Sequence, residues 1–525
     1  MKKKTLATKI GAALMSAVLA VSMAACGNDG ASQGSSSQED TSLDGSQSES
    51  GNQDSGESSG DSGENSGDTS ADASGSEDAG DGEASGDGEN QAGGAVVLHE
   101  PKDLGGRTIK IGLWWDEYWD SNYQTLEDVT AAGGSYSNSE TMQMKLDKMR
   151  EIESRWNCKI EWVNLGWDGI MESINTSITA GTPDCDIYLT DPQFGIPAVL
   201  NGYAQKISVF APADSDILND NVVLTPFSVL GSDEYLMCTS DNYTIPTGAA
   251  YMAYNADMLD SLNLEAPEKL AERGEWTWEK FAEYALACTR DTDGDGNTDT
   301  YGYGTVWTDT VSAFLASNNA AIANSATEGL SDSKTVEVFN FLDRLYNVDG
   351  SARPYDNDDW DYQLNGIFQG QVAFSMVKPY QLIDQAGKLD FEIHICPLPV
   401  GTSGDGSQTP VMLVNSYFIP IGVEDAESVY LVFEEMQNWF DGDTYYRDDP
   451  EWFESAFASL EQVELGYQEG AKTNDDLWHS IDSNGAVGEV WYGIFVNKDM
   501  TVSQAIESKK QVLQDTLDAA TALIK

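Results

Sequence analysis

The stretch 27–95 limits the fold of this chain more than any other sequence feature. It consists almost entirely of Gly, Ser, Asp, Glu, Asn, Gln, Ala and Thr, with 17 acidic residues, no Lys or Arg and no aromatic residue. Such a segment cannot bury enough apolar surface to offset the entropy lost on ordering, so we expect a disordered tether. The rest of the 525 residues, 96–525, is long enough for a head of two or three domains.

The residues before the tether have the pattern of a secretory signal. Four Lys lie within the first nine residues, and the uncharged apolar run 10–23 that follows is too short to span a bilayer. Residues 23–26, Met-Ala-Ala-Cys, resemble a bacterial lipobox, in which the Cys is diacylated. We expect a signal peptide at 1–25 and lipidation (palmitate) at Cys26, with this lipid as the only membrane attachment. An uncleaved membrane anchor is the alternative.

The charge of the chain excludes one class of partner. The formal net charge is −60, and residues 96–525 alone carry −47. A polyanion such as nucleic acid is therefore not an expected partner. The chain has three His, which leaves little room for a multi-histidine metal site. Five Cys follow Cys26 without any CxxC, and we predict small buried thiols for them; they are Cys158, Cys185, Cys238, Cys288 and Cys396.

Strand and helix patterns alternate along the head. Strands are predicted at 107–113, 158–163 and 186–189, and apolar residues recur at helical spacing in the segments between them. This order predicts an α/β fold with a parallel or mixed sheet covered by helices. Thr277 is the predicted N-cap of a further helix, and the last amphipathic helix is expected to end near Ile524.

Several short motifs then follow one another in a characteristic order. They lie at 113–115, 183–188, 245–247 with 251–255, 276–281, 368–374, and 397–399 with 418–421. Each is weak alone, but together they resemble the family 1 extracellular solute-binding proteins, the maltose-binding-protein-like receptors of carbohydrate ABC importers. The resemblance begins near residue 105 and continues to the end of the chain.

This resemblance implies a two-lobed fold of the periplasmic-binding-protein type (type II), with hinge strands between the lobes. The first α/β lobe would comprise 104–248 plus about 414–445, and the second 249–413. Residues 446–525 would form a C-terminal helical region that packs across both lobes. The acidic, aromatic segment 441–454 is an insertion for which the family pattern offers no place.

The resemblance also implies a function. The head would capture a sugar or oligosaccharide in the interlobe cleft and deliver it to an ABC transporter permease, without catalysis and as a monomer. The protein would then work outside the cell, on the outer face of the cytoplasmic membrane. The long tether suits a single-membrane, Gram-positive envelope.

Candidate ligand contacts are aromatic and polar residues that follow predicted strands. Aromatic rings stack on the C–H faces of sugars, and carboxylates and amides pair with the hydroxyls. Strand ends at a domain interface are the usual place for such groups. Tyr380 and Trp491 are included because the resemblance places stacking aromatics there; packing in the core is the alternative for every ring. The candidates are Trp114, Trp115, Asp191, Phe194, Trp307, Tyr380 and Trp491.

Residues 291–299 match the first nine positions of a calcium loop. Side-chain oxygens recur at the ligand positions, and Gly296 permits the sharp turn, but Gly302 occupies the position where a bidentate Glu is expected. We predict a structural Ca²⁺ there and no catalytic cofactor, with an acidic surface turn as the alternative. The predicted ligands are Asp291, Asp293, Asp295, Asn297 and Asp299.

Two other functions compete with sugar capture. A secreted, acidic, Trp-rich protein could be a glycoside hydrolase that uses two carboxylates. Within residues 96–525 no GxSxG, HExxH, P-loop or dinucleotide motif is present, and paired carboxylates are too common there to identify a catalytic pair. The same fold could alternatively bind a peptide, a polyamine or another small solute.

Overall fold

The computed structural model describes residues 96–136, 138–212, 215–218, 234–237, 248–355, 360–410, 415–474, 476, 478–482 and 485–524. The chain divides into two units, Met1–Gln91 and Ala92–Lys525, and all described residues belong to the second. The predicted signal peptide, Cys26 and the tether lie outside the described residues. Cys238 and the motif 245–247 also lie outside them.

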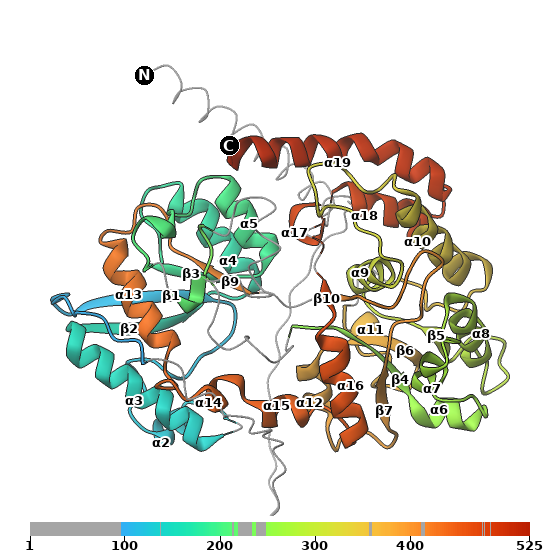
Figure 1. Ribbon diagram of the computed structural model, residues 1–525, viewed down its shortest axis with the longest axis horizontal. Coiled ribbons are helices and arrows are strands. Elements are labelled where there is room, and N and C mark those ends of the chain that lie inside the picture. Colours follow the sequence, from blue (N-terminus) through green and yellow to red (C-terminus); the bar gives the residue numbers. More distant parts are fainter. Residues whose placement is uncertain are drawn as a thin grey trace, which may run out of the picture. The chain divides into compact units, whose positions relative to one another are not determined.

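The first sheet has the strand order β2-β1-β3-β9. Strands β1 (Arg107–Leu113), β2 (Cys158–Asn164) and β3 (Ile187–Thr190) are parallel, and β9 (Ser416–Phe418) runs antiparallel to β3. The three predicted strands are confirmed, each within one residue at its ends. Strand β9 adds a distant part of the sequence to the sheet (Figure 1).

Helices cover this first sheet. Helix α3 (Ser139–Trp156) packs against β2 and against α13 (Ala426–Gln437), while α5 (Pro192–Leu200) packs against β3 and β9. Helix α4 (Trp167–Ser173) packs against β1 and continues as a π-helical turn, Ile174–Ile178. The shorter helical elements of this lobe are α2 (Leu126–Ala131), η2 (Ile207–Val209) and η3 (Asp216–Leu218).

The second sheet has the strand order β5-β6-β4-β7. Strand β4 (Tyr251–Asn255) lies antiparallel to β6 (Val372–Val377) and to β7 (Ile393–Cys396), and β5 (Tyr301–Tyr303) is parallel to β6. With two separate mixed sheets, each covered by helices, the predicted two-lobed α/β fold is confirmed (Figure 1).

The helices of the second lobe enclose a large aromatic core. The Thr277 side chain accepts a hydrogen bond from the backbone of Lys280, so the predicted N-cap is confirmed. The helical elements are α6 (Ala256–Ser261), α7 (Pro267–Glu272), α8 (Trp278–Cys288), α9 (Trp307–Ser317), α10 (Ser333–Asp343), η6 (Arg344–Val348), α11 (Trp360–Leu364) and α12 (Pro379–Gln385).

The C-terminal region is mainly helical and contacts both lobes. Helix α16 packs on β4 and β7 of the second lobe, whereas α17 packs on α5 of the first lobe and also on α18 and α19. Its elements are α14 (Thr444–Asp448), α15 (Pro450–Glu454), α16 (Leu460–Gly470), β10 (Thr473–Asn474), which pairs with β8 (Thr409–Pro410), α17 (Trp478–Asp482), α18 (Ala486–Trp491), η7 (Tyr492–Val496) and α19 (Val502–Ile524).

The segment 441–454, which the sequence pattern could not place, joins the two lobes. Asp441 at its start pairs with the buried Lys148 of α3 at 2.6 Å. Phe453 near its end is fully buried in a core cluster that also contains Tyr251 of β4. The segment, which contains α14 and α15, therefore leads from the first lobe to the core of the second.

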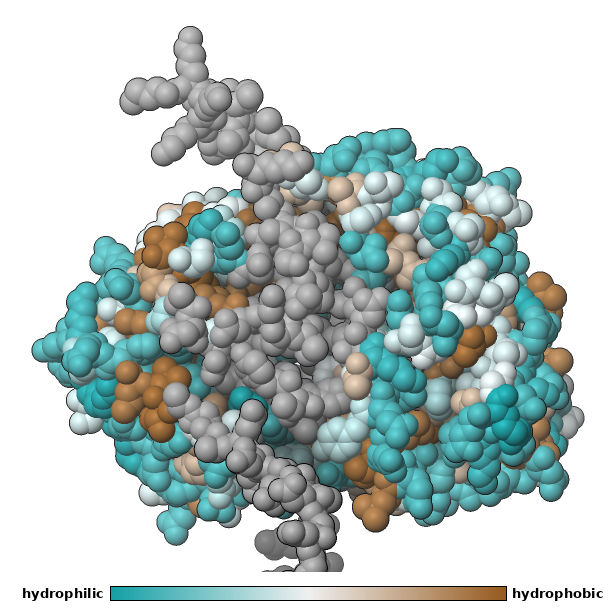
Figure 2. All heavy atoms as spheres, in the orientation of Figure 1, coloured by the Kyte–Doolittle hydropathy of each residue, from teal (hydrophilic) through white to brown (hydrophobic). Residues whose placement is uncertain are grey.

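The face of the molecule drawn in Figure 2 is largely polar where it is not grey. On the face shown in Figure 2, the residues outside the grey atoms are mostly hydrophilic and the hydrophobic patches are scattered.

Four of the predicted buried thiols, Cys158, Cys185, Cys288 and Cys396, are buried and unpaired, which confirms the prediction for them.

No helix within the described part of the chain has the length and apolar character needed to cross a bilayer.

Candidate ligand-binding site

Four aromatic residues, which we call the aromatic cluster, follow the three parallel strands of the first sheet. Trp114 and Trp115 come directly after β1, Trp167 begins α4 after β2, and Phe194 lies in α5 after β3. Because parallel strands end at the same edge of a sheet, this topology gathers rings that are far apart in the sequence.

The rings of the aromatic cluster form a continuous row. The centroids of Trp115 and Trp114 are 4.9 Å apart, those of Trp114 and Trp167 are 5.2 Å apart, and those of Trp167 and Phe194 are 4.7 Å apart. The first two contacts are edge-to-face, with interplanar angles of 84° and 90°. Trp167 is 44 % exposed, whereas Phe194 is buried beneath it. The row thus presents an accessible aromatic surface at the strand ends.

Asp191 is placed by the same strand ends. It is the N-cap of α5, and its Oδ1 accepts a hydrogen bond of 2.9 Å from the backbone N–H of Gln193. Burial raises the pKa of Asp191, while this hydrogen bond and the positive charges of His479 and Lys378 oppose the rise. Asp191, a predicted site residue, therefore lies close enough to His479 and Lys378 for their charges to affect its pKa.

Those groups come from the second lobe and from α17. Lys378, between β6 and α12, pairs through Nζ with Oδ2 of Asp309 in α9 at 2.5 Å, and both side chains are buried. His479 lies on α17, the helix that packs against α5. Burial lowers the pKa of His479, and the charges of Asp191 and Asp309 oppose that shift. We call Asp191, Asp309, Lys378 and His479 the polar quartet.

The sequence candidates in the second lobe are placed differently. Tyr380, the second residue of α12, is 42 % exposed. Trp307 and Trp491 lie in the core of the second lobe, with ring centroids 5.8 Å apart, and Trp491 is fully buried. The structure thus gathers Trp114, Trp115 and Phe194 in one cluster, and it does not bring Trp307 and Trp491 to that cluster.

Sequence reasoning missed Trp167, Asp309, Lys378 and His479. Trp167 was detectable, because it follows β2 just as Trp114 follows β1. Lys378 directly follows β6, so the rule that ligand-binding residues follow strands could also have found it. Nothing in the sequence around Asp309 or His479 indicates that both lie near Lys378, since their proximity depends on how α9, α12 and α17 are packed.

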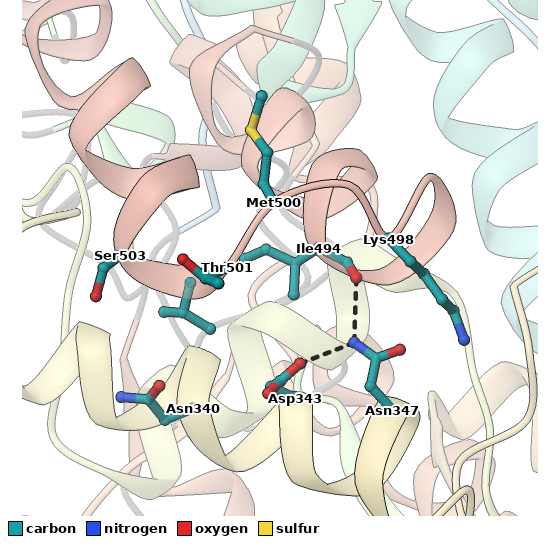
Figure 3. Close-up of a pocket in the computed structure, with 9 residues that line it drawn as sticks. Asn340, Asp343, Asn347, Ile494, Lys498, Met500, Thr501 and Ser503 are labelled. Carbon is teal, nitrogen blue, oxygen red and sulfur yellow. Dashed lines mark hydrogen bonds between the residues drawn. The ribbon is translucent and has the colours of Figure 1, made fainter.

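Two pockets lie away from the polar quartet. One, of about 390 Å³, lies between α10 with η6 and the turn before α19 (Figure 3). There the Nδ2 of Asn347 donates hydrogen bonds to Asp343 and to the carbonyl of Ile494. None of its lining residues is aromatic, so it offers no stacking surface for a sugar.

The other pocket, of about 230 Å³, lies beside the aromatic cluster. It is lined by acidic and amide side chains that include Asp116, Glu117 and Asn164, and Glu117 accepts a 2.9 Å hydrogen bond from Trp115 Nε1. The buried Asp120 also lines it, and burial raises the pKa of Asp120. Asn164 Nδ2 also donates to Oδ1 of Asp116 at 2.9 Å, and these two hydrogen bonds hold the loop that carries the first two rings of the cluster.

The predicted calcium loop brings together three of its five candidate ligands. Carboxylate oxygens of Asp291, Asp293 and Asp299 lie within 4.8 Å of one another, and all three side chains are exposed. Asp295 and Asn297 instead bind each other, at 2.9 Å between Asn297 Nδ2 and Asp295 Oδ2. The converging carboxylates fit the oxygen ligands that Ca²⁺ prefers, though without the full set.

The loop is held in this shape by its own backbone. The two carboxylate oxygens of Asp291 accept hydrogen bonds from the N–H groups of Gly294 and Gly296, at 2.6 and 2.8 Å. Both glycines have positive φ, +81° and +93°, which residues with a side chain rarely adopt. Hydrogen bonds from Thr292 lower the pKa of Asp299.

Solved structures of low sequence identity share the fold. An ABC substrate-binding protein, Lmo0181 from Listeria monocytogenes in complex with cycloalternan, matches with a TM-score of 0.54 at 14 % identity, covering 79 % of this chain and 99 % of that one. A cyclic α-maltosyl-1,6-maltose binding protein from Arthrobacter globiformis also reaches a TM-score of 0.54, at 15 % identity and with the same coverage.

A third structure extends the range of ligands seen with this fold. UgpB from Mycobacterium tuberculosis, in complex with glycerophosphocholine, has a TM-score of 0.52 at 14 % identity and covers 72 % of this chain and 96 % of that one. No curated protein matches the chain in sequence.

The family comparison covers more than half of the chain. The model described as bacterial extracellular solute-binding protein matches residues 149–430, which include β2 and β3, the whole second sheet and β9. The chain therefore belongs to the family of bacterial extracellular solute-binding proteins.

Proposed function

We propose that this protein is a lipid-anchored receptor that captures a sugar or oligosaccharide between its two lobes and delivers it to the permease of an ABC transporter. The observation that carries the proposal is the aromatic cluster, which presents Trp167 and its neighbours at the strand ends of the first sheet. Aromatic rings suit the apolar C–H faces of a sugar, and such sites occur preferentially at domain interfaces.

The polar quartet supplies the other half of the site. Asp191 from the first lobe and the Asp309–Lys378 pair from the second are hydrogen-bonding groups for the hydroxyl rim of a sugar. Ligand held between these groups would stabilise the closed arrangement of the lobes by a hinge motion. Binding, closure and release are the whole mechanism, with no covalent step and no catalytic residue.

The ligands of two similar structures support a sugar. The Listeria protein was solved with cycloalternan, and the Arthrobacter protein is named for a cyclic maltosyl-maltose. UgpB, which has the same fold, was solved with glycerophosphocholine. Another small solute, such as a peptide or polyamine, is therefore the second candidate, and a glycoside hydrolase is the third.

The anchoring part of the proposal comes from the sequence. Cleavage after residue 25 and diacylation of Cys26 would fix the protein to the outer face of the cytoplasmic membrane of a Gram-positive cell, with the segment 27–95 as spacer. The protein would act as a monomer. Metabolic labelling with radioactive palmitate tests the lipid anchor, because Cys26→Ser should abolish the label.

A thermal-shift screen of the Cys26→Ser chain against mono- and oligosaccharides tests the ligand class. A ligand at a hundredfold its Kd stabilises the folded state by about 2.7 kcal/mol, which is a shift of a few degrees for a protein of this size. One family of oligosaccharides that raises Tm supports the proposal, provided that the sugar is recovered unchanged. A cooperative melt that no sugar shifts favours peptides or polyamines, and turnover of the sugar favours the hydrolase.

We also propose that Asp291, Asp293 and Asp299 hold a structural Ca²⁺, with Asp295 and Asn297 turning inward to complete the site. The convergence of the three exposed carboxylates supports this. Ca²⁺ would fix the loop between α8 and β5 and would supply no chemistry to ligand binding.

A further inference from the structure

The segment that enters the head, residues 99–106, is fastened to the first lobe by buried charges. His99 donates its backbone N–H to Oε1 of Glu435 at 2.7 Å, and its Nε2 lies 2.6 Å from Oε2 of Glu434. Both glutamates belong to α13 and are at most 2 % exposed. Buried carboxylates are expensive unless they are paired, so this contact is more than a surface ion pair.

Arg155, near the end of α3, completes the arrangement. Its Nη1 donates to Oε2 of Glu435 at 2.7 Å, and its Nη2 donates to the carbonyl oxygen of His99 at 2.6 Å. Trp156 Nε1 also donates to Oε2 of Glu435, at 3.0 Å. We call His99, Arg155, Glu434 and Glu435 the N-terminal clasp.

The formal charges of the clasp sum to zero only when His99 is protonated. Two carboxylates face one guanidinium, so the clasp is neutral when His99 carries a proton and has one excess negative charge when His99 is neutral. The other charged groups near by are Glu151 on α3, 4.0 Å from Arg155, and Glu100, Lys102 and Asp103 within the segment. Lys102 pairs with Asp425 at the surface and is not part of the clasp.

We propose that the N-terminal clasp is a proton-operated latch, which holds residues 99–106 against α3 and α13 while His99 is protonated and loosens its hold when His99 loses the proton. The contacts that the latch supports include two backbone hydrogen bonds, Leu104 N–H to the carbonyl of Trp156 at 2.9 Å and Gly106 N–H to that of Asn157 at 2.7 Å. The latch is independent of the ligand and of the proposed function.

The direction of the pH effect follows from the contacts. The hydrogen bond to Glu434 is the largest cause of a raised pKa for His99, with the charges of Glu434 and Glu435 adding to it and burial and Arg155 opposing it. A raised folded-state pKa means that the stabilisation is fully present below the unfolded value of about 6.5 and is lost as the pH rises through the folded-state pKa.

Opening of the latch has a mechanical consequence. While it is closed, the chain leaves the head at a point fixed on α3 and α13 of the first lobe. Release of the eight residues 99–106 adds up to about 28 Å of extended chain, at about 3.5 Å per residue. The contacts of the clasp that the structure describes all lie within the first lobe, so the latch holds residues 99–106 to that lobe.

Hydrogen–deuterium exchange of the full chain tests the latch. Protection factors, corrected for the intrinsic pH dependence of exchange, are compared at pH 6.0 and pH 8.5 for peptides that contain residues 99–106. Each unit by which the pKa of His99 exceeds its unfolded value corresponds to about a tenfold loss of protection between the two pH values. Peptides from β6 and α8 of the second lobe serve as the internal reference and should keep their protection.

Variants separate the latch from general loss of structure. His99→Gln and Glu434→Gln should both show low, pH-independent protection of residues 99–106, with unchanged protection of the reference peptides. Lys102→Ala, which removes the exposed pair in the same segment, should keep the pH dependence of the parent. Equal protection of the parent at both pH values, an equal drop in the reference peptides, or an unchanged pH dependence in Glu434→Gln would each overturn the proposal.

Discussion

The ring centroids of Trp167 and Phe194 lie 4.7 Å apart, although the two residues belong to different helices, α4 and α5. Each ring follows a parallel strand of the first sheet, β2 or β3, and Trp114 after β1 also contacts Trp167. The accessible ring of this group is Trp167, so substitution of Trp167 is the most direct probe of the site.

Replacement of Trp167 by Ala should weaken binding of the oligosaccharide identified in the thermal-shift screen. Loss of one stacking ring removes on the order of 1.5 kcal/mol of contact energy, which is roughly tenfold in Kd. Isothermal titration calorimetry measures the change. The matched control is Tyr445→Ala, which removes an exposed aromatic ring from α14, outside the cluster. Equal affinity of Trp167→Ala and Tyr445→Ala for the sugar would remove the aromatic cluster from the site.

The buried pair Lys378–Asp309 should be sensitive to removal of one partner. Lys378→Met leaves the carboxylate of Asp309 buried and unpaired, which costs about 3–5 kcal/mol of unfolding free energy. Urea unfolding followed by circular dichroism gives the difference. The double variant Asp309→Asn/Lys378→Met should recover much of the loss, because no uncompensated charge remains.

An exposed pair provides the comparison for this prediction. Lys280 pairs with Glu283 at 2.6 Å on the surface of α8, and Lys280→Met should cost less than about 1 kcal/mol. A loss for Lys378→Met as small as that for Lys280→Met would mean that water already solvates the Asp309 carboxylate.

Much of the fold could be predicted because local patterns and family motifs agree. The strand patterns gave β1, β2 and β3 nearly to the residue, and Thr277 marked the start of α8. The segment 441–454 could not be placed, because its role depends on Phe453 entering a core built from two distant stretches of the chain, residues 249–253 and residues 367–395. Such a contact leaves no periodic signal.

The candidate site was predicted unevenly for a related reason. The rule that ligand residues follow strands gave Trp114, Trp115, Asp191 and Phe194, which the structure gathers at one sheet edge. Trp307 follows a strand too, but α9 turns its ring into the core beside Trp491. Whether a ring after a strand faces solvent or the core is decided by the packing of the helix that carries it.

Calcium should stabilise the loop 291–299. Addition of Ca²⁺ to metal-free protein is expected to raise Tm, and EDTA should reverse the shift, because the ion binds the folded loop and not the unfolded chain. Asp293→Asn should weaken the response while leaving the Tm in EDTA nearly unchanged, since this side chain is exposed and its amide oxygen can still accept the hydrogen bond from Asp295 N–H. A Tm that EDTA and Ca²⁺ leave unaltered in the parent would identify the loop as an acidic surface turn.

Asp482 should make the head less stable as the pH rises through its folded-state pKa. Burial raises the pKa of Asp482 from 3.8 to about 6, although its side chain accepts a hydrogen bond from the backbone of Val487 at the start of α18. The folded state therefore binds more protons than the unfolded state between pH 4 and 6, and unfolding free energy falls as the pH rises through this window.

The variant Asp482→Asn isolates this effect, because an amide oxygen can still accept the hydrogen bond but carries no charge. At pH 7.5 the variant should be more stable than the parent by about 2–3 kcal/mol, at 1.36 kcal/mol per pKa unit, and at pH 4 the two should be equal.

Asp515→Asn on the exposed face of α19 changes the net charge equally and should show no such pH-dependent gain. Because the head carries −47, acid also relieves general repulsion, but that contribution is shared by both variants and cancels in the comparison. If the Asp482→Asn variant gains the same unfolding free energy at pH 4 and at pH 7.5, the Asp482 carboxyl of the folded parent does not change its charge between these two pH values, which contradicts the prediction.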